Sequence, residues 1–168
     1  RQGTYKPESD GETIRYLFIP QTFTNAYIEA YKDIDTPVYL IIEEINCGNC
    51  AQIFGDLFQL LDRGSDGYSE YPIDADKDLR DYIKTELTKA KGIDPDTEPE
   101  GIQGGKLRLP PNLHILATMN TSDQSLFPMD SAFKRRWDWE YVPIKYSGAT
   151  SDHFTIKFSD KKFRWIDF

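Results

Sequence analysis

An unbroken apolar run that ends in two acids constrains the fold of this chain more than any other feature. The run extends from Val38 to Ile42, and Glu43 and Glu44 follow it directly. A continuous run of this kind, rich in β-branched residues, is typical of a strand covered on both faces of a parallel sheet. Because ligands of open α/β sheets bind at the carboxyl ends of the strands, we expect the two carboxylates at a ligand-binding edge.

Two adjacent carboxylates are costly at such an edge unless a cation offsets their charge. A divalent metal ion does this in the Walker B element of P-loop nucleoside triphosphatases, where the first acid supports Mg²⁺ and the second polarises the attacking water. The pattern therefore makes Glu43 and Glu44 candidate metal-binding residues and Glu44 a candidate catalytic base. An ordinary strand end with solvated carboxylates fits the motif equally well, and both readings stay open on the motif alone.

Composition limits the class of protein. The 168 residues are 39% hydrophobic and 14% aromatic, which is enough for one domain with a real core. No apolar run approaches the roughly 20 residues of a spanning helix, and no signal peptide is recognisable, so a cytoplasmic location is expected. The net charge of −8 argues against a large phosphate-binding surface, so any DNA contact is expected elsewhere. The sequence begins at Arg1 without an initiator Met and ends at Phe168 in an apolar pattern, so we expect it to be a piece of a longer protein.

The two cysteines form a lone Cys-Gly-Asn-Cys motif at Cys47 and Cys50. A zinc site needs about four ligands, and the two histidines, His114 and His153, lie far away in sequence. We therefore expect two reduced thiols at a helix start and His114 inside a buried strand. A thiol redox protein is an alternative that would require one thiol with a strongly lowered pKa.

Hydrophobic periodicity predicts a single partial α/β domain over residues 1–168, in which strands alternate with helices. A helix with Thr22 as its cap should precede the first apolar run, and a second helix should carry the apolar face from Ile53 to Leu61. The other expected elements are an insertion at about 64–105 with an amphipathic helix between Asp76 and Gly92, strands at 13–19, 113–119 and 140–144, and a β-hairpin extension at about 146–168.

Polar clusters also follow the later apolar segments. The strand that ends at Met119 is followed by Asn120-Thr-Ser-Asp123, and a helix expected to begin at Pro128 ends in Lys134-Arg135-Arg136. Phosphoryl transfer requires a metal to offset charge, a polar group to orient water and a guanidinium to stabilise developing negative charge. The order acid pair, polar segment and arginine pair therefore points to this chemistry.

With these motifs the chain resembles the AAA+ ATPases, and more closely the McrB family, the nucleotide-driven motor subunits of methylation-dependent restriction systems. The resemblance covers about residues 18–141, and the conjunction of motifs is more specific than any one of them. Three segments are similar to the family's Walker B element, sensor segment and arginine-bearing helix, in that order: Glu43-Glu-Ile-Asn46, Met119-Asn-Thr-Ser-Asp-Gln-Ser125 and Asp130-Ser-Ala-Phe-Lys-Arg-Arg-Trp137.

The resemblance implies a mostly parallel sheet flanked by helices and a role for each motif residue. Glu43 would support Mg²⁺, Glu44 would activate water, and Asn120 would position that water as the sensor, with Asp123 in the same nucleotide-contacting signature. Arg135 and Arg136 would act as a finger or sensor at a neighbouring subunit's nucleotide, and the sequence does not separate their roles. A helix end stabilised by cations is the alternative for the arginines.

Two positions depart from the family pattern. Glu43 stands where the family commonly has Asp, and Cys47 stands where it commonly has Arg. A larger departure is that no Gly-x-x-x-x-Gly-Lys-Ser/Thr phosphate loop occurs in these 168 residues. We therefore expect these residues alone to be inactive and the full-length protein to hydrolyse GTP or ATP.

The resemblance further implies a ring, expected to be a hexamer, that powers a separate nuclease subunit of the McrC type. DNA would be bound through other regions. The alternative is a degenerate AAA-like scaffold or binding module that performs no hydrolysis.

Overall fold

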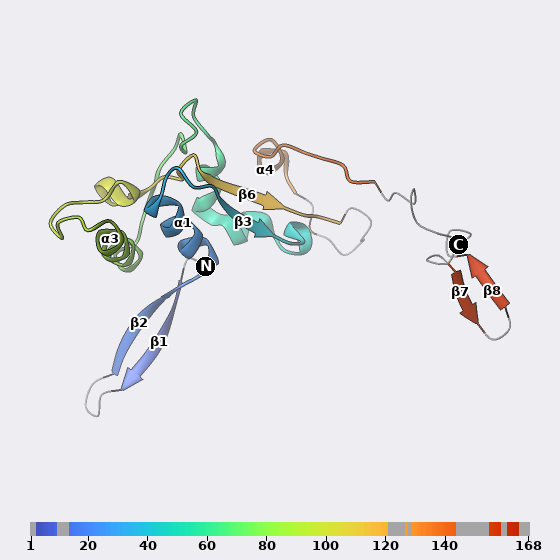
Figure 1. The fold of residues 1–168 in the computed structure, drawn as a ribbon, viewed down its shortest axis with the longest axis horizontal. Coiled ribbons are helices and arrows are strands. Elements are labelled where there is room, and N and C mark those ends of the chain that lie inside the picture. Colours follow the sequence, from blue (N-terminus) through green and yellow to red (C-terminus); the bar gives the residue numbers. More distant parts are fainter. Residues whose placement is uncertain are drawn as a thin grey trace. The chain divides into compact units, whose positions relative to one another are not determined.

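The computed structural model describes residues 3–9, 14–120, 127, 129–143, 155–158 and 161–164. It divides into two units, Arg1–Trp137 and Asp138–Phe168, of which the first contains nearly all of the packed structure. The first unit is an α/β structure with a small parallel sheet and surrounding helices (Figure 1). Among the described helices, none combines the length and the apolar character that crossing a membrane would require.

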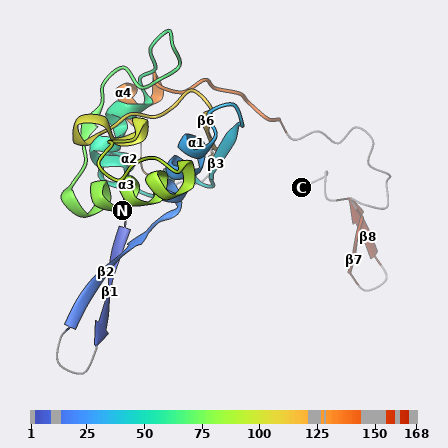
Figure 2. The ribbon, with the colours of Figure 1, turned by 60° about the vertical axis from the view of Figure 1, so that its left-hand side comes forward.

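The parallel sheet consists of β3 (Val38–Ile42) and β6 (Leu113–Ala117), which lie side by side in both ribbon views (Figures 1 and 2). Their register pairs Val38 with Leu113 and Ile42 with Ala117, so the two strands end together. Helix α1 (Thr22–Lys32) packs against both strands. The expected Thr22 cap is wrong, because Gln21 is the N-cap residue and makes no side-chain capping bond.

The opposite face of this sheet is exposed, which corrects the expectation of a strand buried on both faces. Tyr39 and Ile41 of β3 are 59% and 64% exposed, and Leu116 of β6 is exposed beside them. His114 is also exposed, not buried as expected, and its ring stacks on Tyr39 with centroids 5.1 Å apart. The described helices cover only the face that carries Leu40 and Leu113, so the apolar run is half covered in this chain.

Helix α3 (Lys77–Lys91) confirms the amphipathic helix expected within the 64–105 segment. Asp76 caps it by accepting a hydrogen bond from the Leu79 amide at 2.9 Å, and Gly92 ends it with φ of 61°, a conformation that glycine adopts without strain. The buried side of α3 packs against Tyr27 and Tyr31 of α1. This packing forms the main core, to which α3 contributes Leu79, Ile83 and Leu87.

The helical segments that follow the acids are shorter than predicted. The expected continuous helix from Ile53 to Leu61 is wrong, because α2 (Cys50–Phe54) gives way to the 3₁₀ segment η2 (Gly55–Leu61). Gly55 lies at the junction with φ of 48°, which interrupts the α-helical geometry. A short 3₁₀ turn, η1 (Ile45–Cys47), precedes α2, and α4 is limited to Ser131–Lys134.

The described strands outside β3 and β6 pair only in antiparallel fashion, so the expected mostly parallel sheet is reduced to one parallel pair among the described residues. Residues 140–143 form no strand, contrary to expectation, whereas a hairpin within 146–168 is confirmed. The segment η3 (Glu100–Gly105) consists of two short 3₁₀ turns separated by a kink at 102–104, and it leads into β5 (Lys106–Leu107). The antiparallel pairs are β1 (Gly3–Ser9) with β2 (Ile14–Pro20), β4 (Ile73–Asp74) with β5 (Lys106–Leu107), and β7 (Thr155–Phe158) with β8 (Lys161–Arg164).

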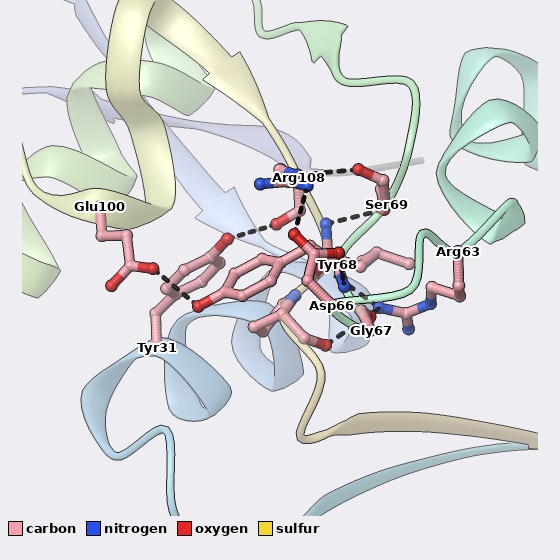
Figure 3. Close-up of polar contacts among 10 residues, drawn as sticks. Tyr31, Arg63, Asp66, Gly67, Tyr68, Ser69, Glu100 and Arg108 are labelled. Atoms are coloured by element: carbon pink, nitrogen blue, oxygen red, sulfur yellow. Dashed lines mark hydrogen bonds and ion pairs between the residues drawn. The ribbon is translucent and has the colours of Figure 1, made fainter.

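A half-buried arginine, Arg63, fixes the approach to β6. The Arg63 guanidinium donates hydrogen bonds to main-chain carbonyls at 2.8–3.2 Å, and burial lowers its pKa. Beside it, Arg108 donates to Asp66 and to the Ser69 carbonyl and lies over the Tyr68 ring (Figure 3). These contacts hold the loop after η2 against the segment that enters β6. The carbonyls bound by Arg63 belong to Gly67, Leu109, Pro110 and Leu113.

Candidate functional site

The acid pair and the second polar segment meet at one edge of the sheet. The chain leaves β3 and β6 at the same level, and the arrowheads of the two strands lie side by side in Figure 1. Three hydrogen bonds continue the pairing beyond the strands: Thr118 N to Ile42 O at 2.9 Å, Ile45 N to Thr118 O at 2.9 Å, and Glu44 N to the Thr118 hydroxyl at 3.3 Å. The acid pair and the polar residues after β6 therefore lie at the same edge of the sheet.

Glu44 has an unusual backbone conformation. Its φ and ψ are 52° and 49°, the left-handed region, and among the described residues it is the one non-glycine with positive φ. Such a conformation costs about 1–3 kcal/mol and is often found where function requires a particular geometry. The Glu44 amide bonded to Thr118 and the Glu44 carbonyl, which accepts from Cys47 N at 2.9 Å, hold the turn in place.

Glu43, Glu44 and Thr118 line an open cavity of about 580 Å³. Both carboxylates are exposed to solvent. Two carboxylates and a hydroxyl offer the hard oxygen ligands that Mg²⁺ prefers, and Mg²⁺ sites commonly use one or two carboxylates together with substrate phosphates. The described residues contain no cluster of three or more His, Cys, Asp or Glu side chains suited to a metal. The residues therefore fit a magnesium ion held jointly with a phosphate ligand better than a site built from protein groups alone.

Asn120 lies at the same edge, three residues after β6, with an exposed side chain. Its main-chain carbonyl accepts a hydrogen bond from the side chain of Asn46, a residue of η1. Asp123 and Pro128 lie outside the described residues. Sequence reasoning gave no role to Thr118 or Asn46, although Thr118 is the first polar residue after β6 and could have been found by the logic applied to Glu43.

The two arginines differ sharply in environment. The side chain of Arg136 is 9% exposed and bound on several sides: Nε and Nη2 donate to Asp62 Oδ2 at 3.0 and 2.7 Å, and Nη1 donates to the Ala132 carbonyl at 2.7 Å. Its guanidinium also lies 4.0 Å from the centroid of the Phe58 ring. Arg135, by contrast, is exposed. Within the described part of the chain, neither arginine is bonded to Glu43 or Glu44.

A second core cluster connects α4 with the turn at residues 43–47, which is called the acid turn below. Asp130 caps α4 by accepting from Phe133 N at 2.7 Å, and Phe133 is buried. Phe133 packs with Ile45, which follows Glu44, and with Cys50 at the start of α2. The position of α4 is thus fixed relative to the end of β3.

The cysteines form no disulfide, as expected. The exposed Cys47 thiol donates to Glu44 Oε2 at 3.2 Å, whereas Cys50 is buried and donates to the Ile45 carbonyl at 3.3 Å. Burial raises the pKa of the Cys50 thiol, which is opposite to the shift that a reactive redox cysteine requires. For Cys50 the geometry therefore argues against the redox reading.

No family model matches the chain. Among curated proteins, the chain is similar to the component YdiS of the type II restriction enzyme BsuMI from Bacillus subtilis (strain 168). The two are 38% identical over 167 residues, which cover 97% of this chain and 45% of the relative. The chain therefore spans about half the length of the relative that it matches.

Proposed function

We propose that this chain is part of an McrB-like AAA+ nucleoside triphosphatase that serves a restriction system. The observation that carries the proposal is the shared edge of β3 and β6, where Glu43, Glu44 and Thr118 line one cavity and Asn120 follows. The likeness to a named restriction-enzyme component supports the biological setting. The exposed face of the parallel sheet is consistent with a larger sheet structure in the complete protein.

In this proposal each residue has a defined part in hydrolysis. Bound Mg²⁺ would neutralise charge on the phosphates of GTP or ATP, with Glu43 as its principal protein support. Glu44 would accept a proton from the attacking water, and the Asn120 amide would orient that water. Asp123 belongs to the same segment by resemblance alone.

Arg135 is proposed as the arginine that acts on a neighbouring subunit's nucleotide. It is exposed, whereas Arg136 would have to break its ion pair with Asp62 to reach outward. Arg136 then serves as the internal support that fixes the C-terminal end of α4. This division assigns the two adjacent cations to different roles, which the sequence alone left open.

The phosphate loop is absent from these residues, so hydrolysis would require a loop supplied by another part of the protein. The proposed assembly is a ring, expected to be hexameric, that acts with a nuclease subunit of the McrC type, with DNA bound by other regions. The same absence, together with the net charge of −8, favours the second candidate, an AAA-like scaffold that performs no hydrolysis.

The test is Mg²⁺-dependent hydrolysis of GTP and ATP by the full-length protein and by its Glu44→Gln variant. Loss of the proton acceptor should lower kcat by about 10²- to 10⁴-fold while nucleotide binding persists. Glu70→Gln, which changes an exposed glutamate far from the strand ends in sequence, is the matched control and should keep full turnover. Absence of hydrolysis in the unmodified protein would favour the scaffold, and full turnover by Glu44→Gln would remove Glu44 from its role.

A further inference from the structure

Asn46 contacts both residues that flank the segment 121–126. It lies two residues after Glu44 and is only 4% exposed. The side-chain Nδ2 of Asn46 donates to the main-chain carbonyl of Asn120 at 2.9 Å. The main-chain carbonyl of Asn46 accepts from Phe127 N at 3.1 Å. One residue of the acid turn therefore fixes the chain on either side of the sensor segment.

The support beneath Asn46 is rigid. The preceding residue, Ile45, is buried, and its amide and carbonyl are bonded to Thr118 O and to the Cys50 thiol. Within the described residues, the Asn46 Oδ1 atom is buried without a hydrogen-bond partner. The Asn46 side-chain amide is thus oriented by its donor bond to the Asn120 carbonyl. Apolar packing does not explain a buried amide whose one hydrogen bond, among the residues that the structure describes, goes to this carbonyl.

We infer that Asn46 is a positioning residue that holds the main chain of Asn120, and through it the sensor side chain, in register with Glu44. The inference rests on the proposed function of Glu44 and Asn120. Asn46 is buried beneath the edge and has no proposed contact with nucleotide or water. We expect Asn46 to affect hydrolysis because the reacting water loses its orientation when the Asn120 side chain shifts by about 1 Å.

The kinetic test is a double-mutant cycle in the full-length protein with Asn46→Ala, Asn120→Ala and the double variant. Asn46→Ala should lower kcat by about 10- to 100-fold and change KM little, because positioning and not nucleotide binding is lost. In the Asn120→Ala background the same change should have almost no further effect. Equal losses in both backgrounds, or unchanged kcat in Asn46→Ala, would overturn the inference.

Two further variants separate the donor bond from general structural damage. Asn46→Asp keeps the side-chain shape but removes the donor, and it should lower kcat as Asn46→Ala does. Gln52→Ala removes an exposed amide from α2 and should leave turnover unchanged. Normal turnover by Asn46→Asp would contradict the role of the Nδ2 donor.

Amide hydrogen exchange tests the contact without any hydrolysis. In nucleotide-free Asn46→Ala, the amides of Thr118 and Phe127 should exchange faster, whereas those of α3 should not change. Unchanged exchange at Thr118 and Phe127 would overturn the inference even if the protein hydrolyses no nucleotide. Missing hydrolysis with faster exchange would instead contradict the proposed function and leave the positioning contact supported.

Discussion

Arg136 is bound to Asp62 through two of its guanidinium nitrogens, which approach the same carboxylate oxygen at 3.0 and 2.7 Å. Asp62 ends the 3₁₀ segment η2, and Arg136 follows α4, so the ion pair joins two elements that lie 74 residues apart in sequence. Asp62 and the next residue, Arg63, thereby connect the end of η2 to two places. Asp62 binds Arg136, which follows α4, and Arg63 binds the Leu113 carbonyl at the start of β6.

Loss of the Arg136 side chain should destabilise the fold, whereas loss of Arg135 should not. Removing one partner of a largely buried ion pair costs about 3–5 kcal/mol, and we expect the lower end because Asp62 is 28% exposed. Replacement of the exposed Arg135 should change stability by less than about 0.5 kcal/mol. Urea unfolding of Arg136→Ala and Arg135→Ala measures the difference, and equal free energies of unfolding would contradict the assignment.

Alkaline pH should unfold the protein through the tyrosines of the main core. Burial raises the pKa of Tyr27 and of Tyr31, and burial with the Glu100 hydrogen bond raises the pKa of Tyr68 to about 12. Unfolded tyrosine ionises near pH 10, so the unfolded chain loses these protons first. The stabilisation is complete below about pH 10 and falls as pH rises above it, by about 1.4 kcal/mol per pH unit for each of Tyr27 and Tyr31.

The measurement is the free energy of unfolding between pH 9 and 12, with tyrosinate absorbance followed in parallel. Tyr31→Phe should reduce the steepness of the decline because one titrating group is removed. An unchanged slope in Tyr31→Phe would show that Tyr31 ionises equally well in the folded protein.

The two cysteines should differ in reactivity. Cys47 is exposed, whereas Cys50 is buried with a raised pKa, so alkylation of the native protein should modify Cys47 first. Because the Cys47 thiol lies 3.2 Å from Glu44 Oε2, its modification should also reduce hydrolysis in the full-length protein. Peptide mass mapping and turnover measure both effects, with Cys47→Ser as the unreactive control. Comparable labelling of Cys50 would contradict the buried position.

The sequence was sufficient to predict the elements whose causes are local. The strand Val38–Ile42 follows from its apolar run, and α3 follows from its apolar spacing together with the Asp76 cap and Gly92. The break between α2 and η2 was missed because the apolar spacing continues across Gly55, whose positive φ the pattern does not reveal. Periodicity reports which side chains are apolar, and it cannot report a single backbone angle.

Other features could not be predicted because their causes are distant in sequence. Arg135 and Arg136 are adjacent and chemically identical, and they are distinguished by contacts of Arg136 with groups that the sequence does not place beside it, above all Asp62 and the Phe58 ring. The exposure of Tyr39 and Ile41 depends on which helices this chain supplies to the sheet. The roles proposed for Glu43, Glu44 and Asn120 remain predictions that hydrolysis assays must test.

The central claim, that acid and arginine from different subunits complete one hydrolytic site, is tested most directly by mixing two inactive variants of the full-length protein. Glu44→Gln subunits retain Arg135, and Arg135→Ala subunits retain Glu44, so a mixed assembly contains some sites with both groups intact. The account predicts that each variant alone has little hydrolysis and that mixing restores part of it. No recovery at any mixing ratio would contradict the account.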